Sequence, residues 1–207
     1  MYKLKVCGMK YPDNIRQLVE LKPDFIGFIF YKKSKRFIDN GLGMRSVKFP
    51  ESIKKVGVFV NAEVDEIKDK IKEYQLDLVQ LHGDESPEIC KELKQTGIKI
   101  SKAFQVDENF DFSVLKPFFS VCDYYLFDTK TKLYGGSGKK FNWKILEKYN
   151  NQKPFFLSGG IDLEDVDEID KLKNLNIFAI DINSKFEISP GVKDIEKIKK
   201  FKIGLEI

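Results

Sequence analysis

Four side chains suited to proton transfer or anion binding each follow an apolar run that is predicted to be a strand. Cys7 ends YKLKVC, Arg36 follows DFIGFIF, His82 ends LDLVQLH and Asp128 ends DYYLFD. Thiolates, imidazoles and carboxylates can move protons, and a guanidinium binds carboxylates in two places at once. Singly, each has an ordinary structural explanation: inert buried thiol, solvated basic run, satisfied histidine or turn-capping carboxylate. Their shared position at strand ends indicates a common site.

Small and flexible residues follow the last three predicted strands. Gly136 and Gly138 lie in the tract after Asp128, Gly159 and Gly160 end the next apolar run, and the Asn183-Ser184 turn ends the last one. Glycine lets the backbone approach a ligand closely, and N–H groups at a helix start bind anions. Three such loops side by side predict a binding site for a phosphorylated small molecule.

The composition favours a folded protein and gives little support to nucleic-acid or membrane binding. Lys and Arg total 36 against 32 acidic residues in 207, so the net charge is +4, and these charges are spread along the chain. A nucleic-acid groove needs a concentrated basic patch instead. Neither a signal peptide nor a run of 18 apolar residues is evident. Three cysteines without metal-ligand spacing predict neither disulfides nor a metal site. We expect a cytoplasmic protein, monomeric or homodimeric.

The elements that would carry these side chains alternate along the chain. Eight short β-branched or aromatic runs are each followed by a helical pattern, for example Ile67, Ile71 and Tyr74 at helical spacing. Such alternation implies parallel strands joined by crossovers, and eight repeats close into a (β/α)8 TIM barrel. We therefore predict an α/β fold with one domain over residues 1–207 and the site at the carboxyl ends of the strands. The predicted strands are 2–8, 24–30, 54–61, 76–83, 98–104, 123–129, 153–160 and 177–184. The predicted helices are 12–21, 40–48, 64–74, 86–97, 111–119, 143–149, 163–173 and 193–202.

Motifs along nearly the whole chain resemble those of phosphoribosylanthranilate isomerase. They are KVCGM (5–9), GFIFYKKSKRFI (27–38), VGVFVN (56–61), VQLHGDESPE (79–88), LFDT (126–129), YGGSGKKFNW (134–143), LSGGI (157–161) and SPGVKD (189–194). The resemblance implies a (β/α)8 barrel without metal or organic cofactor. It would convert N-(5′-phosphoribosyl)anthranilate into 1-(2-carboxyphenylamino)-1-deoxyribulose 5-phosphate, an Amadori rearrangement in tryptophan biosynthesis.

The same resemblance assigns roles within the site. Asp128 resembles the general acid and Cys7 the general base, and Arg36 would hold the anthranilate carboxylate. The pKa of an ordinary thiol is about 8.5, so we expect a lowered pKa at Cys7 to supply thiolate at neutral pH. His82 would line the mouth, with packing or orientation as its first role. The phosphate would lie on the backbone N–H groups of Gly136, Gly138, Gly159, Gly160 and the Asn183-Ser184 turn.

The chain departs from the family pattern after the last strand. Asn183 stands where the family usually has serine and Lys185 where it has glycine, so a positive φ at Lys185 would be strained.

Three other functions are compatible with a phosphate-binding barrel. The first, an isomerase of histidine synthesis, would have an aspartate in place of Cys7. A ribulose-phosphate epimerase would need several histidines as metal ligands, and this sequence has 1. A binding module for phosphorylated sugars is the remaining alternative.

Overall fold

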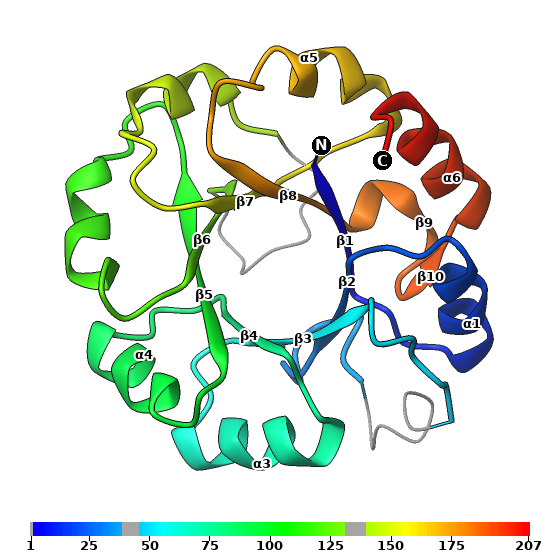
Figure 1. Cartoon of the computed structure of the whole chain (residues 1–207), viewed down its shortest axis with the longest axis horizontal. Coiled ribbons are helices and arrows are strands. Elements are labelled where there is room, and N and C mark those ends of the chain that lie inside the picture. The colour runs from blue at the N-terminus through cyan, green and yellow to red at the C-terminus, as the bar shows by residue number, and fades with distance from the viewer. Residues whose placement is uncertain (1, 39–45, 131–139) are drawn as a thin grey trace.

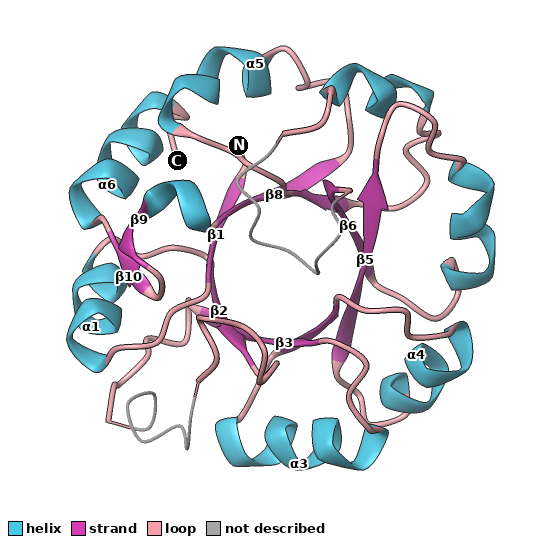
Figure 2. Cartoon of the chain, turned by 180° about the vertical axis from the view of Figure 1, so that it is seen from behind, coloured by secondary structure: helices cyan, strands magenta, loops and turns pink. Residues whose placement is uncertain are grey.

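The protein is described from a computed structural model over residues 2–38, 46–130 and 140–207. Eight parallel strands pair in chain order, and β8 pairs with β1 to close a barrel. The strands form an inner ring with the helices outside it (Figure 1), and the same ring is seen from the other end in Figure 2. The predicted (β/α)8 barrel is thus confirmed. The single domain over 1–207 stays a prediction, because the description has gaps.

The strands lie close to their predicted positions. They are β1 Lys3–Cys7, β2 Phe25–Ile29, β3 Lys54–Phe59, β4 Leu78–Leu81, β5 Lys99–Val106, β6 Tyr124–Thr129, β7 Phe155–Leu157 and β8 Ile177–Ile182. Two short strands, β9 Glu187–Ser189 and β10 Val192–Lys193, form an antiparallel hairpin that was not predicted. This hairpin follows β8 and carries Glu187 and Lys193 toward the site.

The outer layer contains α-helices and tighter 3₁₀ helices. The α-helices are α1 Pro12–Glu20, α3 Val64–Tyr74, α4 Pro87–Lys94, α5 Val166–Asp170 and α6 Ile195–Gly204. The 3₁₀ helices are η1 Phe112–Phe118, η2 Trp143–Lys148, η3 Leu163–Asp165 and η4 Ser184–Phe186. The helix predicted at 40–48 falls mostly on residues 39–45, outside the described ranges.

The helices predicted at 111–119 and 143–149 are present as 3₁₀ helices. Each begins with a side-chain oxygen that accepts from the backbone N–H two residues on, Asp111 from Ser113 and Asn142 from Lys144. Such a bond begins a tight turn, and short segments tolerate 3₁₀ geometry. Pro117 inside η1 also lacks the N–H that a longer α-helix needs. Periodicity detected the helical segments but not their type.

Alternation along each strand separates two apolar layers. On β1, Leu4 and Val6 belong to the large core between strands and helices, whereas Cys7 belongs to the cluster inside the barrel. The lower part of that interior is aromatic: the rings of Phe25 and Phe156 are 5.5 Å apart, and those of Tyr124 and Phe178 are 4.4 Å apart. Ring contacts of this kind add about 0.5–1.5 kcal/mol beyond area burial. The aromatic layer closes one end of the barrel and leaves the other end to polar side chains.

Candidate active site

A single pocket at the carboxyl ends of the strands brings the predicted site residues together. It is lined by Cys7, Arg36, His82, Asp128, Gly159, Gly160, Asn183 and Ser184, among others. Gly136 and Gly138 lie outside the described residues. Every predicted site residue within the described ranges therefore lies at this one mouth.

Asp128 is held on β6 with both carboxylate oxygens engaged. Its Oδ1 accepts from the Thr129 backbone N–H at 2.8 Å, and its Oδ2 is 3.1 Å from Nε2 of His82. The residue is 8% exposed, so the hydrogen bonds act in a largely dry environment. This carboxyl group is fixed in position and faces a pocket, as a proton-transfer group must be.

Cys7 ends β1 on the inner face of the barrel and is buried. Burial raises the pKa of its thiol, while Lys5, Lys193 and Arg36 act in the opposite direction. The expectation of a lowered pKa at Cys7 is therefore wrong: removal from water outweighs the nearby cations. Gly27 on β2 leaves the space for the sulfur, because a Cβ at Gly27 would lie 2.8 Å from Sγ.

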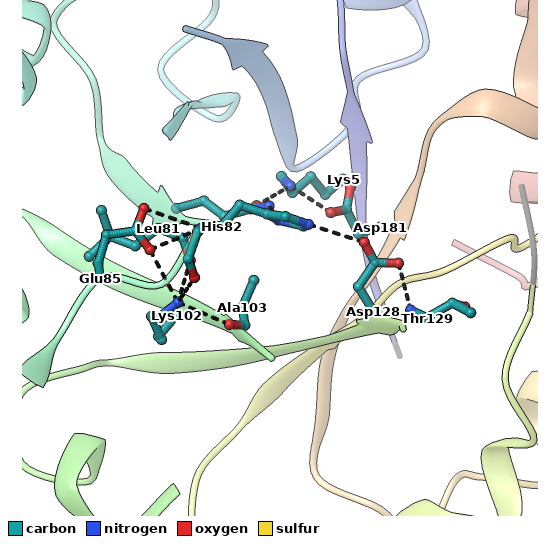
Figure 3. A network of polar contacts seen from close by, with 11 residues as sticks. Lys5, Leu81, His82, Glu85, Lys102, Ala103, Asp128, Thr129 and Asp181 are labelled. Atoms are coloured by element: carbon teal, nitrogen blue, oxygen red, sulfur yellow. Dashed lines mark hydrogen bonds and ion pairs between the residues drawn. The ribbon is translucent and has the colours of Figure 1, made fainter. Parts of the chain in front are cut away.

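A buried ion pair lies beneath Cys7. Lys5 is fully buried, and its Nζ donates to Asp181 Oδ2 at 2.6 Å (Figure 3). The same Nζ donates to Gln80 Oε1 at 2.5 Å. Burial lowers the pKa of Lys5, but Asp181 and Cys7 together raise it, with a net rise, so the amine stays charged. A buried pair of this kind needs each partner, because removal of one leaves an uncompensated charge.

Arg36 is fixed by a carboxylate from the hairpin after β8. Its Nε is 2.8 Å from Glu187 Oε1 and its Nη2 is 2.6 Å from Oε2. Lys193, also buried, donates to Glu187 Oε1 and to Asn183 Oδ1, both at 2.7 Å. Burial would raise the pKa of Glu187, but Arg36 and Lys193 outweigh it and lower that pKa. Burial likewise lowers the pKa of Lys193 to about 8.

The backbone segments expected to bind phosphate adopt compact turns. Gly159 has φ +95, and a Cβ there would lie 2.4 Å from Thr129 Oγ1 and 2.9 Å from Asp128 Oδ1. Only glycine accommodates both that φ and the close approach to β6. Ser184 and Lys185 lie in η4, and Lys185 is not among the residues with positive φ. The strain considered for Lys185 is therefore absent.

Several residues that line this pocket or support its lining were not predicted as site residues: Lys5, Gln80, Asp181, Glu187 and Lys193. Two of them carried a signal in the sequence. KLKVC puts Lys5 on the same strand face as Cys7, and LVQLH puts Gln80 on the same face as His82. A polar residue at an inward position of an apolar strand points into the barrel. Asp181 lies on β8, whereas the contacts of Glu187 and Lys193 depend on the hairpin geometry, which the sequence does not reveal.

Across residues 2–38, 46–130 and 140–207, no three His, Cys, Asp or Glu side chains cluster as metal ligands would. No helix in the same ranges combines the length and apolar character needed to cross a bilayer.

Comparison with known proteins gives consistent matches over almost the full chain. The family model described as N-(5′-phosphoribosyl)anthranilate (PRA) isomerase matches residues 4–202. A Parabacteroides distasonis protein named N-(5′-phosphoribosyl)anthranilate isomerase is 46% identical over 96% of this chain and 90% of its own length.

Two solved structures are similar as well. One is phosphoribosyl anthranilate isomerase in complex with reduced 1-(o-carboxyphenylamino)-1-deoxyribulose 5-phosphate, with 32% identity and a TM-score of 0.85 over 100% of this chain and 99% of that one. The other is described as monomers generated from the dimeric Thermotoga maritima isomerase, with 32% identity, a TM-score of 0.84 and the same coverage.

Proposed function

The chain belongs to the N-(5′-phosphoribosyl)anthranilate isomerase family, and we propose that it catalyses the reaction of that name. N-(5′-phosphoribosyl)anthranilate is isomerised to 1-(2-carboxyphenylamino)-1-deoxyribulose 5-phosphate. The observation that carries the proposal is that Cys7 and Asp128 line one pocket from two strands, β1 and β6. An acid and a base at one mouth are what an Amadori rearrangement requires.

The first chemical step opens the ribose ring. Asp128 gives a proton to the ring oxygen, the bond from that oxygen to C1′ breaks, and the anthranilate nitrogen shares its electron pair with C1′ to form an iminium. Asp128 has to carry a proton at this moment.

The second step removes a proton from C2′. Thiolate at Cys7 takes it, and the C–H electrons form a C1′=C2′ double bond as the iminium is neutralised. The resulting enol becomes the ketone when the Cys7 thiol gives a proton to C1′ and the C2′ hydroxyl loses its proton to the Asp128 carboxylate. Both groups return to their starting forms, so atoms and charge balance with no net oxidation. Lys5, Lys193 and Arg36 all favour the thiolate over the thiol. These three cations offset part of the burial cost.

The two anionic ends of the substrate would each have their own binding residues in the pocket. Arg36 presents a planar guanidinium, oriented by Glu187, for the anthranilate carboxylate. The backbone of Gly159, Gly160, Asn183 and Ser184 supports a phosphate site, since all four residues line the pocket. Gly136 and Gly138 belong to the same proposal from the sequence alone.

The proposals for oligomeric state and location rest on the family. A solved relative is described as dimeric, and of the expected monomer or homodimer we propose the homodimer for this chain. A cytoplasmic location is proposed because tryptophan biosynthesis draws on phosphorylated intermediates of the cytoplasm.

Turnover of the named substrate tests the proposal. Phosphoribosylanthranilate is generated in situ, and its fluorescence is followed after addition of the purified protein, with the product distinguished from its isomeric substrate by chromatographic retention. Protein-dependent formation of the rearranged product is expected. If folded protein binds the reduced product analogue without turnover, the binding-module alternative replaces the isomerase.

A further inference from the structure

A chain of polar contacts connects Asp128 to Lys5 across the barrel. From Asp128 Oδ2 the chain runs to His82 Nε2 at 3.1 Å, from His82 Nδ1 to Gln80 Nε2 at 2.8 Å, and from Gln80 Oε1 to Lys5 Nζ at 2.5 Å. Lys5 Nζ also donates to Asp181 Oδ2 at 2.6 Å. Figure 3 shows Lys5, His82, Asp128 and Asp181 converging inside the barrel. The contacts link the proposed acid to the strand that carries the proposed base.

The donor and acceptor inventory fixes the direction of every bond in this chain. A lysine ammonium carries only donors, so the Gln80 atom that faces it must be the carboxamide oxygen. The other end of Gln80 is then its NH₂ group, which donates. His82 Nδ1 must accept that bond and therefore has no proton. The ring proton of neutral His82 lies on Nε2, which donates to Asp128.

Rotation of the Gln80 amide would break this arrangement. It would turn the NH₂ group toward the ammonium of Lys5, placing donor against donor in a site where Lys5 is 0% and Gln80 is 2% exposed. A buried polar group without a partner is costly, and the rotated NH₂ group would face only another donor. Asp181 keeps the Lys5 amine charged and in place. The orientation of Gln80 is thus set by the ion pair beneath it.

We propose that Lys5 and Gln80 are positioning residues that lock His82 as the neutral tautomer with its proton on Nε2, so that His82 presents a hydrogen-bond donor to Asp128. A second proton on Nδ1 would meet the Gln80 NH₂ group. His82 therefore orients Asp128 and does not itself supply the proton in the ring-opening step. The catalytic part of this inference rests on the proposed function, whereas the tautomer itself does not.

Nitrogen NMR of the imidazole ring tests the lock directly. The chain contains 1 histidine, so a uniformly ¹⁵N-labelled protein without a histidine tag gives a single ring spin system. At pH 7.5 we expect an unprotonated Nδ1 and a protonated Nε2. A protonated Nδ1 in the wild-type protein would overturn the proposal, whether or not the protein is an active isomerase.

Gln80→Glu is the informative variant, because it keeps the shape and replaces the NH₂ donor by an acceptor. We expect Nδ1 to become protonated and kcat to fall about tenfold or more with KM changed less than about threefold, as loss of acid–base alignment would do. Gln95→Glu makes the same change at an exposed position and should alter neither the ring nitrogens nor kcat. An unchanged nitrogen pattern in folded Gln80→Glu would remove Gln80 as the lock.

The two hypotheses fail in different ways. A wild-type protein with the expected tautomer but no turnover contradicts the proposed function and leaves the lock intact. Active wild-type protein together with a Gln80→Glu variant that changes tautomer yet keeps kcat contradicts the positioning role. Lys5→Met in an Asp181→Asn background avoids an unpaired buried carboxylate, and there we expect both tautomers of His82. A single Nε2–H tautomer in that double variant would exclude Lys5 from the lock.

Discussion

The carboxylate of Glu187 accepts two hydrogen bonds from one edge of the Arg36 guanidinium. Nε lies 2.8 Å from Oε1 and Nη2 lies 2.6 Å from Oε2, and the two side chains are only 13% and 5% exposed. Such a bidentate pair fixes the plane of the guanidinium as well as its position. Arg36 is therefore oriented before any ligand arrives, which reduces the entropy cost of binding.

Replacement of Arg36 by lysine should weaken binding of the anthranilate end. Lysine keeps the charge but cannot form the planar pair with Glu187, so we expect affinity for the reduced product analogue to fall about tenfold or more. Isothermal titration calorimetry measures it. Arg16→Lys is the matched control, because Arg16 is half exposed and pairs with Asp13 on α1. Unchanged affinity in Arg36→Lys would contradict the role proposed for Arg36.

The buried Lys193 should make stability depend on pH above neutrality. Its pKa is lowered from 10.5 to about 8 in the folded protein, so between those values the unfolded chain binds more protons than the native state. Stability attributable to Lys193 then rises with pH across this window, by about 3 kcal/mol at most. Urea unfolding at pH 7.5 and 9.5 measures the difference in free energy of unfolding between wild type and Lys193→Met. From pH 7.5 to 9.5 this difference should grow in favour of wild type, whereas the same difference for exposed Lys199→Met should stay constant. A difference that is flat for Lys193→Met as well would rule out this linkage.

Gly159→Ala should cost both stability and activity. The added Cβ would lie 2.6 Å from the backbone N of Thr129. The alanine would also have to adopt the φ of +95 that Gly159 has. Gly97→Ala isolates the backbone contribution, because Gly97 has φ +83 and no atom within 4 Å of the added Cβ. We expect about 1–2 kcal/mol for Gly97→Ala, and a larger loss with reduced kcat for Gly159→Ala. Equal losses of stability with full activity would show that the contact with β6 is unimportant.

The Cys7 thiol should titrate above its ordinary value. Burial raises its pKa from 9.0 despite three neighbouring cations, so the thiolate fraction should still be increasing when the pH passes 9. Ultraviolet absorbance of the thiolate, taken as wild type minus Cys7→Ser, isolates this group from Cys90 and Cys122. A midpoint below pH 8 would mean that the cations outweigh burial.

The barrel and the main features of its mouth could be predicted from the sequence because both depend on local patterns. Apolar runs that end at Cys7 and Asp128 mark strand ends, and parallel closure brings strand ends together. The pKa direction at Cys7 was predicted wrongly, since a sequence shows neighbours in the chain but not the loss of water around a sulfur. The Arg36–Glu187 contact joins residues that are 151 positions apart. It depends on a hairpin of strands too short to give a pattern.

Lys5 in KLKVC shows the same limit of prediction from the sequence. Alternation assigns Lys5 to the inner face, but only the closed barrel shows that Asp181 and Gln80 meet its amine. Polar residues at inward strand positions are thus detectable as anomalies. Their partners are determined by which strands are neighbours in the closed barrel and by the register between them.

The most direct test of the whole account is the turnover of phosphoribosylanthranilate by wild type, Cys7→Ser and Asp128→Asn, measured side by side with binding of the reduced product analogue. Both variants preserve side-chain shape and remove one proton-transfer function. We predict a rapid wild-type reaction, a loss of about 10²-fold or more in kcat for each variant, and analogue binding within a few-fold of wild type. Full activity in either variant would remove that residue from the mechanism, and an inactive wild type that binds the analogue would contradict the isomerase assignment.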